Sequence, residues 1–112
     1  MALSVDYSTF MEVWEKEYTL TRQLHRNCLR WANKEAIIDP ASNKSFTWAE
    51  WDEESNRWAR AILDVGGGTN DVVMGNLMNT YEWFTVWMGA MKAQHIFSTL
   101  NWRLPEGQLC QL

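Results

Sequence analysis

The feature that most constrains the fold is an apolar, helix-like segment between two short strand-like segments in the second half of the chain. Asp71–Leu77 and Ile96–Leu100 are short and largely apolar, as is typical of buried strands. Tyr81–Lys92, between them, is apolar on most sides and predicts a core helix. A strand, a helix and a strand joined by short connections form a βαβ unit, which implies a parallel strand pair with a right-handed crossover. We therefore predict the α/β fold class.

The start of this predicted helix carries a capping pattern. Asn79 is followed three residues later by Glu82, so we predict a capping box with Asn79 at the N-cap. The helix would then begin at the carboxyl end of a strand, where open α/β sheets often bind ligands. A cap is a sufficient explanation of Asn79, so we assign it no binding role.

The middle of the chain predicts a β-hairpin followed by a long helix. Glu35–Asp39 and Lys44–Thr47 are the two arms, separated by turn-forming residues. Thr47 and Glu50 have the spacing of a capping box, and Gly66 is suited to end the helix in a left-handed conformation. One stripe of the helix is expected to face the core: Trp51, Ser55, Trp58 and Ile62, flanked by Ala59 and Leu63.

An acidic run lies near the start of this helix. We interpret Asp52, Glu53 and Glu54 as a solvated face that complements the helix dipole, and not as a metal site. Glu53 and Arg57 are spaced to form an ion pair on the helix surface.

Residues 1–33 predict two helices, and residues 34–112 predict the α/β part of the same single unit. Apolar positions recur at helical spacing in each of the two helices. They are Phe10, Val13 and Trp14 in the first helix, and Leu20, Leu24, Cys28 and Trp31 in the second. We expect a partial three-layer αβα arrangement, with one domain as the most that 112 residues form.

The end of the chain resembles the beginning of another element. Leu100–Leu109 predicts a strand exit, a polar turn and a helix that starts through Pro105. So short a helix is marginal by itself, and Leu104, Leu109 and Leu112 all need cover. We therefore expect a truncated fragment of a larger domain, with the remainder of a parent chain as partner. An uncovered apolar patch would make the fragment self-associate.

Composition excludes several classes of protein. A net charge of −4 and scattered basic residues argue against a nucleic-acid binder. The first residues lack the basic and apolar regions of a signal peptide, and the longest apolar run is too short to cross a bilayer. These features predict a cytoplasmic protein with no transmembrane segment. Cys28 and Cys110 have neither disulfide-framework nor zinc-site spacing, so we expect buried or idle thiols.

Three local patterns are candidate functional sites. Gly66–Gly68 follows a helix and precedes a strand, the reverse of a dinucleotide-binding fingerprint, so we interpret it as a turn. His25 and Cys28 lie one helical turn apart, but without a third orienting group they indicate an ordinary helix face. His95 is either a lone ligand or acid–base group, or a structural histidine whose ring nitrogens are satisfied.

Taken in order, five segments resemble the opening part of the AMP-forming acyl-CoA synthetases, which belong to the adenylate-forming superfamily. The likeness runs from near Leu24 to the end of the chain and rests on the order and spacing of the set. The segments are Lys34–Ile38, Phe46–Leu63, Gly66–Val73, Asn79–Trp83 and Leu100–Pro105. The chain departs from the family pattern at Met78, Gln94, His95 and Trp102, where the family often has proline or small residues, and this leaves the subclass open.

The resemblance implies a two-step reaction in a longer parent protein. A fatty or other carboxylic acid attacks ATP to give an acyl-adenylate, and coenzyme A then displaces AMP. ATP, Mg²⁺ and coenzyme A are the implied cofactors of the parent. The family's Gly/Ser/Thr-rich loop ending in lysine is absent from these residues. We therefore expect this fragment alone not to catalyse, and assign no catalytic, cofactor-binding or metal-binding residue.

Two other functions stay open at this point. The chain could be a stand-alone interaction or dimerisation module without catalysis, because its ends leave apolar surface uncovered. It could also be a small flavodoxin-like enzyme that binds FMN or NAD, because its predicted class is α/β.

Overall fold

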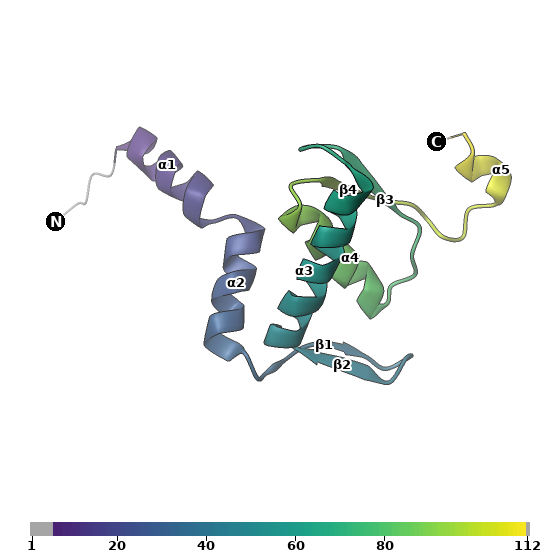
Figure 1. Ribbon diagram of the computed structural model, residues 1–112, viewed down its shortest axis with the longest axis horizontal. Helices are drawn as coiled ribbons and strands as arrows, with labels where there is room; N and C mark the ends of the chain where they lie inside the picture. The colour runs from purple at the N-terminus through teal and green to yellow at the C-terminus, as the bar shows by residue number, and fades with distance from the viewer. Residues whose placement is uncertain (1–5, 112) are drawn as a thin grey trace.

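The computed structural model describes residues 6–111 and forms an α/β fold with two small sheets (Figure 1). Leu112, one of the leucines expected to need cover, lies outside the described residues. The elements, in chain order, are α1 (Tyr7–Glu17), α2 (Leu20–Trp31), β1 (Glu35–Asp39), β2 (Lys44–Thr47), α3 (Trp48–Val65), β3 (Val72–Gly75), α4 (Tyr81–Lys92), β4 (Ile96–Thr99) and α5 (Glu106–Leu109).

The parallel strand pair predicted for the second half is confirmed. β3 and β4 pair in parallel, with Val72 opposite Ile96 and Gly75 opposite Thr99. The intervening helix α4 packs against both strands. The two strands end earlier than predicted, because the ladder stops at Gly75 and Thr99. The α/β fold class is therefore confirmed.

β1 and β2 form a separate antiparallel hairpin, as predicted. Asp39 pairs with Lys44 beside the turn, and Asn43 adopts a left-handed conformation with φ of 54°. Asparagine tolerates this conformation better than most residues. In Figure 1 the hairpin extends beneath the amino-terminal end of α3, at the opposite end of that helix from β3 and β4.

α3 and α4 form the closest pair of helices, and small residues make their approach possible. Ser55 and Ala90 are completely buried. A Cβ atom at Gly89 would lie 2.6 Å from Cβ of Trp58 and 3.1 Å from the carbonyl oxygen of Ser55. The predicted stripe of α3 is therefore partly wrong. Trp58 is 40% exposed, and of the two flanking residues Ala59 is buried while Leu63 is 52% exposed. The close contact of α3 with Gly89 of α4 favours a small side chain such as that of Ala59.

The core lies where α2, α3 and α4 meet the hairpin. Leu24, Cys28, Trp51 and Met88 form its buried cluster. Partly buried apolar residues surround that cluster: Ala36, Ile37, Phe46, Trp48 and Trp87. The apolar face predicted for the second helix is confirmed in part: Leu24 and Cys28 are buried and Trp31 is partly buried, whereas Leu20, in the first turn, is 53% exposed.

Two of the predicted helix ends are confirmed and one is wrong. The Thr47 and Glu50 capping box is complete, and Gly66 ends α3 with φ of 98°. α4 instead has Thr80 at its N-cap, without a side-chain cap, so Asn79 does not cap this helix. The physical reason is tertiary: the free amide of Tyr81 donates to Asp39 Oδ2, at 3.4 Å, on the distant hairpin.

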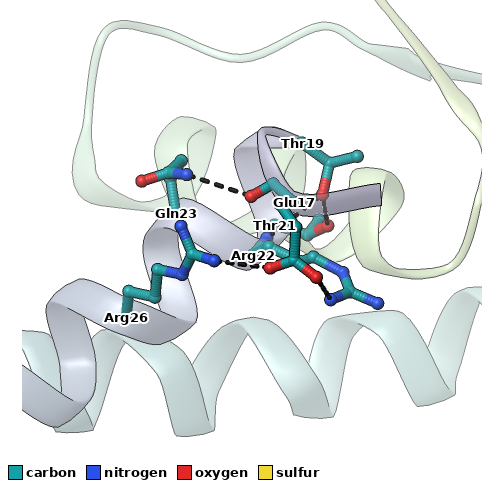
Figure 2. A network of polar contacts seen from close by, with 6 residues as sticks. All are labelled: Glu17, Thr19, Thr21, Arg22, Gln23 and Arg26. Carbon is teal, nitrogen blue, oxygen red and sulfur yellow. Dashed lines mark hydrogen bonds and ion pairs between the residues drawn. The ribbon is translucent and has the colours of Figure 1, made fainter. Parts of the chain in front are cut away.

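α1 extends away from the other helices, and none of its residues is buried (Figure 1). The rings of Phe10 and Trp14 in α1 and of Tyr18, which follows the helix, contact one another in sequence. Figure 2 shows how the junction with α2 is held: the carboxylate of Glu17 lies 3.1 Å from Arg22 and 2.5 Å from Arg26. The amide of Gln23 also donates to the Glu17 carbonyl, which fixes the angle between the two helices.

Among residues 6–111, helices cover only one face of the β3–β4 pair. Val72, Met74 and Ile96, on the outer face, are each more than half exposed. Parallel sheets are usually covered on both faces. The described residues thus supply a partial layered unit, as the sequence predicts.

Candidate functional site

The carboxyl ends of the two parallel strands open into a hollow of about 610 Å³. Its aromatic lining residues are Trp83 and Trp102. Trp83 also stacks with Trp87, with ring centres 6.0 Å apart, as their shared helix face predicts, and contacts Phe97 edge-on. Asn79, Asn101 and Arg103 supply polar groups to the same hollow. Amides and a guanidinium beside aromatic rings suit a planar or anionic group, and this edge is where open α/β sheets bind ligands.

The amino-terminal end of α4 is already occupied by a protein carboxylate. Asp39 is buried, and its Oδ1 accepts hydrogen bonds from the amides of Ala41 and Ser42 while Oδ2 accepts from Tyr81. Burial raises the pKa of Asp39, but the hydrogen bonds from Ser42, Tyr81 and Ala41 lower it more, so its pKa lies below the usual value. The positive end of the α4 dipole also stabilises the negative charge of Asp39. The Tyr81 amide is therefore not free for a ligand.

A second contact ties the hairpin to the same helix end. Lys44 Nζ donates to the Tyr81 hydroxyl at 2.9 Å and lies 4.7 Å from the centre of its ring. The hydrogen bond to Tyr81 raises the pKa of Lys44. The ring of Phe46 packs 5.1 Å from the Tyr81 ring. No local pattern indicates these roles of Asp39 and Lys44, because each residue contacts a helix end that lies far away in the sequence.

Lys92 carries the most connected polar cluster in the described part of the chain. Its ammonium lies 2.6 Å from Asp52 Oδ1, 2.7 Å from Ser55 Oγ and 2.8 Å from Asn56 Oδ1. It also donates to the Asp52 carbonyl at 3.0 Å. The interpretation of Asp52 as a solvated residue is therefore wrong, because α4 brings a cation to it. Glu53 does pair with Arg57 on the helix surface, at 2.8 Å, as predicted.

Cys28 and His25 do not form a catalytic pair. The Cys28 thiol is buried and donates to the Trp48 carbonyl at 3.1 Å. Burial, aided by the nearby Asp52 carboxylate, raises the pKa of Cys28 to about 11, which suppresses the reactive thiolate. His25 is exposed on another side of α2. The structure thus agrees with the prediction that His25 and Cys28 belong to an ordinary helix. The other thiol, Cys110, is exposed.

The three glycines form a turn, as predicted. Gly66 closes α3 by donating to the Leu63 carbonyl, and Gly68 donates to Asp71 Oδ2 at 2.7 Å. The segment leads into β3 and opens no helix, so its amides do not form a phosphate cradle of the dinucleotide-binding type.

His95 is 95% buried at the start of β4, yet only one of its ring nitrogens is satisfied. Nδ1 lies 2.7 Å from the Ala93 carbonyl oxygen. Nε2 has no hydrogen-bond partner among residues 6–111. The prediction of a structural histidine with satisfied ring nitrogens is thus correct for Nδ1 and wrong for Nε2. Within the same described range, no group of three or more His, Cys, Asp or Glu side chains could hold a metal ion.

Residues 6–111 contain no helix with the length and apolar character needed to span a membrane.

Comparison with known proteins points to one family. The family model described as AMP-binding enzyme matches residues 24–112. A medium/long-chain-fatty-acid–CoA/3-oxocholest-4-en-26-oate–CoA ligase of Mycobacterium marinum (strain ATCC BAA-535 / M) is 33% identical over 67 residues, which are 60% of this chain and 12% of that protein. YngI of Bacillus subtilis (strain 168), provisionally named an acyl-CoA synthetase, is 25% identical over 83 residues, or 74% of this chain and 15% of that protein. The chain thus spans less than a sixth of either relative.

Solved structures share the fold. The N-terminal domain of FACL13 from Mycobacterium tuberculosis matches with a TM-score of 0.75 at 21% identity, over 80% of this chain and 23% of that one. The N-terminal subdomain of Klebsiella oxytoca NpsA, in complex with anthranilyl-AMSN, matches with a TM-score of 0.75 at 16% identity, over 82% of this chain and 24% of that one. At these identities the likeness concerns the fold alone.

Proposed function

Because the chain belongs to the AMP-binding enzyme family, we propose that it is the amino-terminal scaffold of an ATP-dependent acyl-CoA synthetase. The whole enzyme would join a carboxylic acid to ATP, forming an acyl-adenylate and pyrophosphate. The thiol of coenzyme A would then displace AMP to give the thioester. A fatty acid is the proposed substrate class, since a fatty-acid–CoA ligase is among the relatives.

The observation that carries this proposal is the extent of the family match. It covers the chain from Leu24 through the hairpin, the core helices and the βαβ unit. These elements pack on one another around a shared core, so the matching region includes the part that folds as a unit.

The proposal gives this chain a bracing role. Mg²⁺ and ATP phosphates need clustered oxygen ligands or converging amides. Among residues 6–111 no acidic cluster fits Mg²⁺, and the glycine turn leads into a strand and so forms no phosphate cradle of converging amides. No step of the reaction is therefore assigned to a residue of this chain, and the catalytic groups, Mg²⁺ and coenzyme A would be held elsewhere in the longer protein.

The test is an assay of the full-length protein that carries this sequence. With ATP, Mg²⁺ and saturated fatty acids of increasing chain length, we expect pyrophosphate release, and with coenzyme A added, AMP and an acyl-CoA detected by mass spectrometry. The 112-residue chain alone, assayed in parallel, should release none. If the full-length protein forms no adenylate with any carboxylic acid, the proposal is wrong.

A second function is favoured by the outer face of β3 and β4. Val72, Met74 and Ile96 expose an apolar surface that is suited to packing against another segment or another molecule. In the leading proposal the remainder of the parent chain covers this apolar surface. The whole enzyme is proposed to be cytoplasmic. In the alternative, a second copy covers the same surface and the chain is an interaction module. Sedimentation of the 112-residue chain that gives a single well-behaved dimer, together with an inactive full-length protein, would favour the alternative.

A further inference from the structure

A second hollow lies at the amino ends of β3 and β4, the opposite end of the strand pair from the polar hollow described above. Its volume is about 520 Å³. The end of α3 and the start of β3 supply its apolar lining, Ile62, Val65, Val72 and Val73, of which Val65 and Val72 are largely exposed to solvent. Gly67 and His95 also line it. This hollow is therefore an apolar space with one buried imidazole at its side.

The tautomer of His95 follows from its single contact. Nδ1 lies 2.7 Å from the Ala93 carbonyl, and a carbonyl oxygen can only accept a hydrogen bond. In the neutral ring, Nδ1 therefore carries the hydrogen and Nε2 presents a lone pair. Nε2 is buried and has no partner within residues 6–111. A buried acceptor without a donor is unfavourable, so the site favours a group that can donate to Nε2.

Gly67 lies directly beside this unpartnered nitrogen. A Cβ atom at residue 67 would lie only 2.3 Å from Nε2, so any other side chain here would collide with the ring. The backbone of the glycine turn therefore lies beside Nε2, with no side chain between them. A small shift of Gly67 would connect Nε2 with the hollow that both residues line.

A metal ion fits this arrangement poorly. Zn²⁺ needs three or four protein ligands, and no group of three or more His, Cys, Asp or Glu side chains occurs in the described chain. Asp71, which also lines the hollow, accepts a hydrogen bond from the Gly68 amide through Oδ2. Nε2 of His95 is the one buried polar side-chain atom of this lining that has no partner within residues 6–111. Apolar walls beside such an acceptor match a neutral molecule with one donor.

We propose that this hollow binds a small, largely apolar alcohol or phenol whose hydroxyl group donates a hydrogen bond to Nε2 of His95. The site is separate from the proposed adenylation chemistry, whose catalytic groups would lie elsewhere in a longer protein. Binding therefore requires neither ATP nor coenzyme A. The result of its test is independent of whether the enzyme proposal holds.

The test compares p-cresol with toluene, which has the same ring and methyl group but no hydroxyl. Both are titrated into the full-length protein labelled with ¹⁵N-histidine, without nucleotide. We expect p-cresol to bind roughly three- to tenfold more tightly than toluene, as one net hydrogen bond predicts. The Nε2 resonance of His95, identified by its loss in His95→Phe, should shift with p-cresol and not with toluene.

Two variants separate the hydrogen bond from the shape of the hollow. His95→Phe keeps an aromatic ring without an acceptor, and Gly67→Ala keeps His95 but places a methyl group beside Nε2. In either variant that folds, the two compounds should bind equally. Equal affinity in the unaltered protein, no binding of either compound, or preference for p-cresol with no change at Nε2 would each overturn the proposal. The wild-type measurement keeps the proposal falsifiable if both variants unfold.

Discussion

Lys92 Nζ lies 2.6 Å from Asp52 Oδ1, and this contact joins α4 to α3 across 40 residues of sequence. The side chains are only 14% and 25% exposed, so neither charge is fully hydrated. The Asp52 carbonyl, Ser55 Oγ and Asn56 Oδ1 also accept hydrogen bonds from the ammonium. A charge held in this way stabilises one arrangement of the two helices, because displacing either helix would leave a partly buried charge without a partner.

Lys92→Met should destabilise the chain, because it removes the ammonium and leaves the Asp52 carboxylate partly buried and unpaired. We expect a loss of about 2 kcal/mol in the free energy of unfolding. Urea unfolding followed by tryptophan fluorescence measures it. Arg57→Met is the matched control, since Arg57 pairs with Glu53 and Glu54 on an exposed surface and such pairs contribute about 0.2–1 kcal/mol. Equal losses in the two variants would contradict the structural role of Lys92.

Gly89→Ala should also destabilise the chain, although alanine is normally the better helix former. Its Cβ would lie 2.6 Å from Cβ of Trp58, a distance that forces α3 and α4 apart. Overpacking of this kind costs about 1–3 kcal/mol. Thermal unfolding measures the change. Gly107→Ala, in α5, is the control, because its Cβ would meet nothing within 4 Å. A Gly89→Ala protein as stable as the Gly107→Ala protein would show that the helices are not so closely packed.

Stability should fall in acid through Asp39. Its pKa is lower in the folded chain than in the unfolded one, because the amides of Ser42, Tyr81 and Ala41 donate to its carboxylate. The unfolded chain therefore binds more protons, and the contribution is present above pH about 4 and lost as pH falls through the folded pKa. Asp39→Asn should lower stability more at pH 7 than at pH 3. Urea unfolding at both values measures this, and a pH-independent difference would contradict it.

The two thiols should react at very different rates. Cys28 is buried with a pKa of about 11, whereas Cys110 is exposed. At pH 8 a chromogenic disulfide reagent should therefore modify one thiol of the folded 112-residue chain rapidly, and the second only in denaturant. Cys110→Ser should remove the rapid phase. Rapid modification that survives this substitution would show that Cys28 is accessible.

Elements with strong local signals could be predicted from the sequence. The capping box of Thr47 and Glu50, the left-handed Gly66 and the parallel pair around the apolar helix are all present in the structure. Asn79 was wrongly predicted as a cap, because the amide it would have served donates to Asp39, 42 residues away. Trp58 was wrongly predicted in the core because helical spacing does not indicate how closely a neighbouring helix approaches.

The candidate sites depended still more on tertiary packing. The amino-acid sequence by itself determined which segments become helices and strands, because periodicity, caps and turn residues act within a few positions of one another. Only the tertiary structure decided that Lys92 neutralises Asp52, that Asp39 occupies the end of α4, and that His95 is buried beneath Gly67 with one nitrogen unpartnered. These outcomes depend on distances between segments that the chain brings together only when its core has packed.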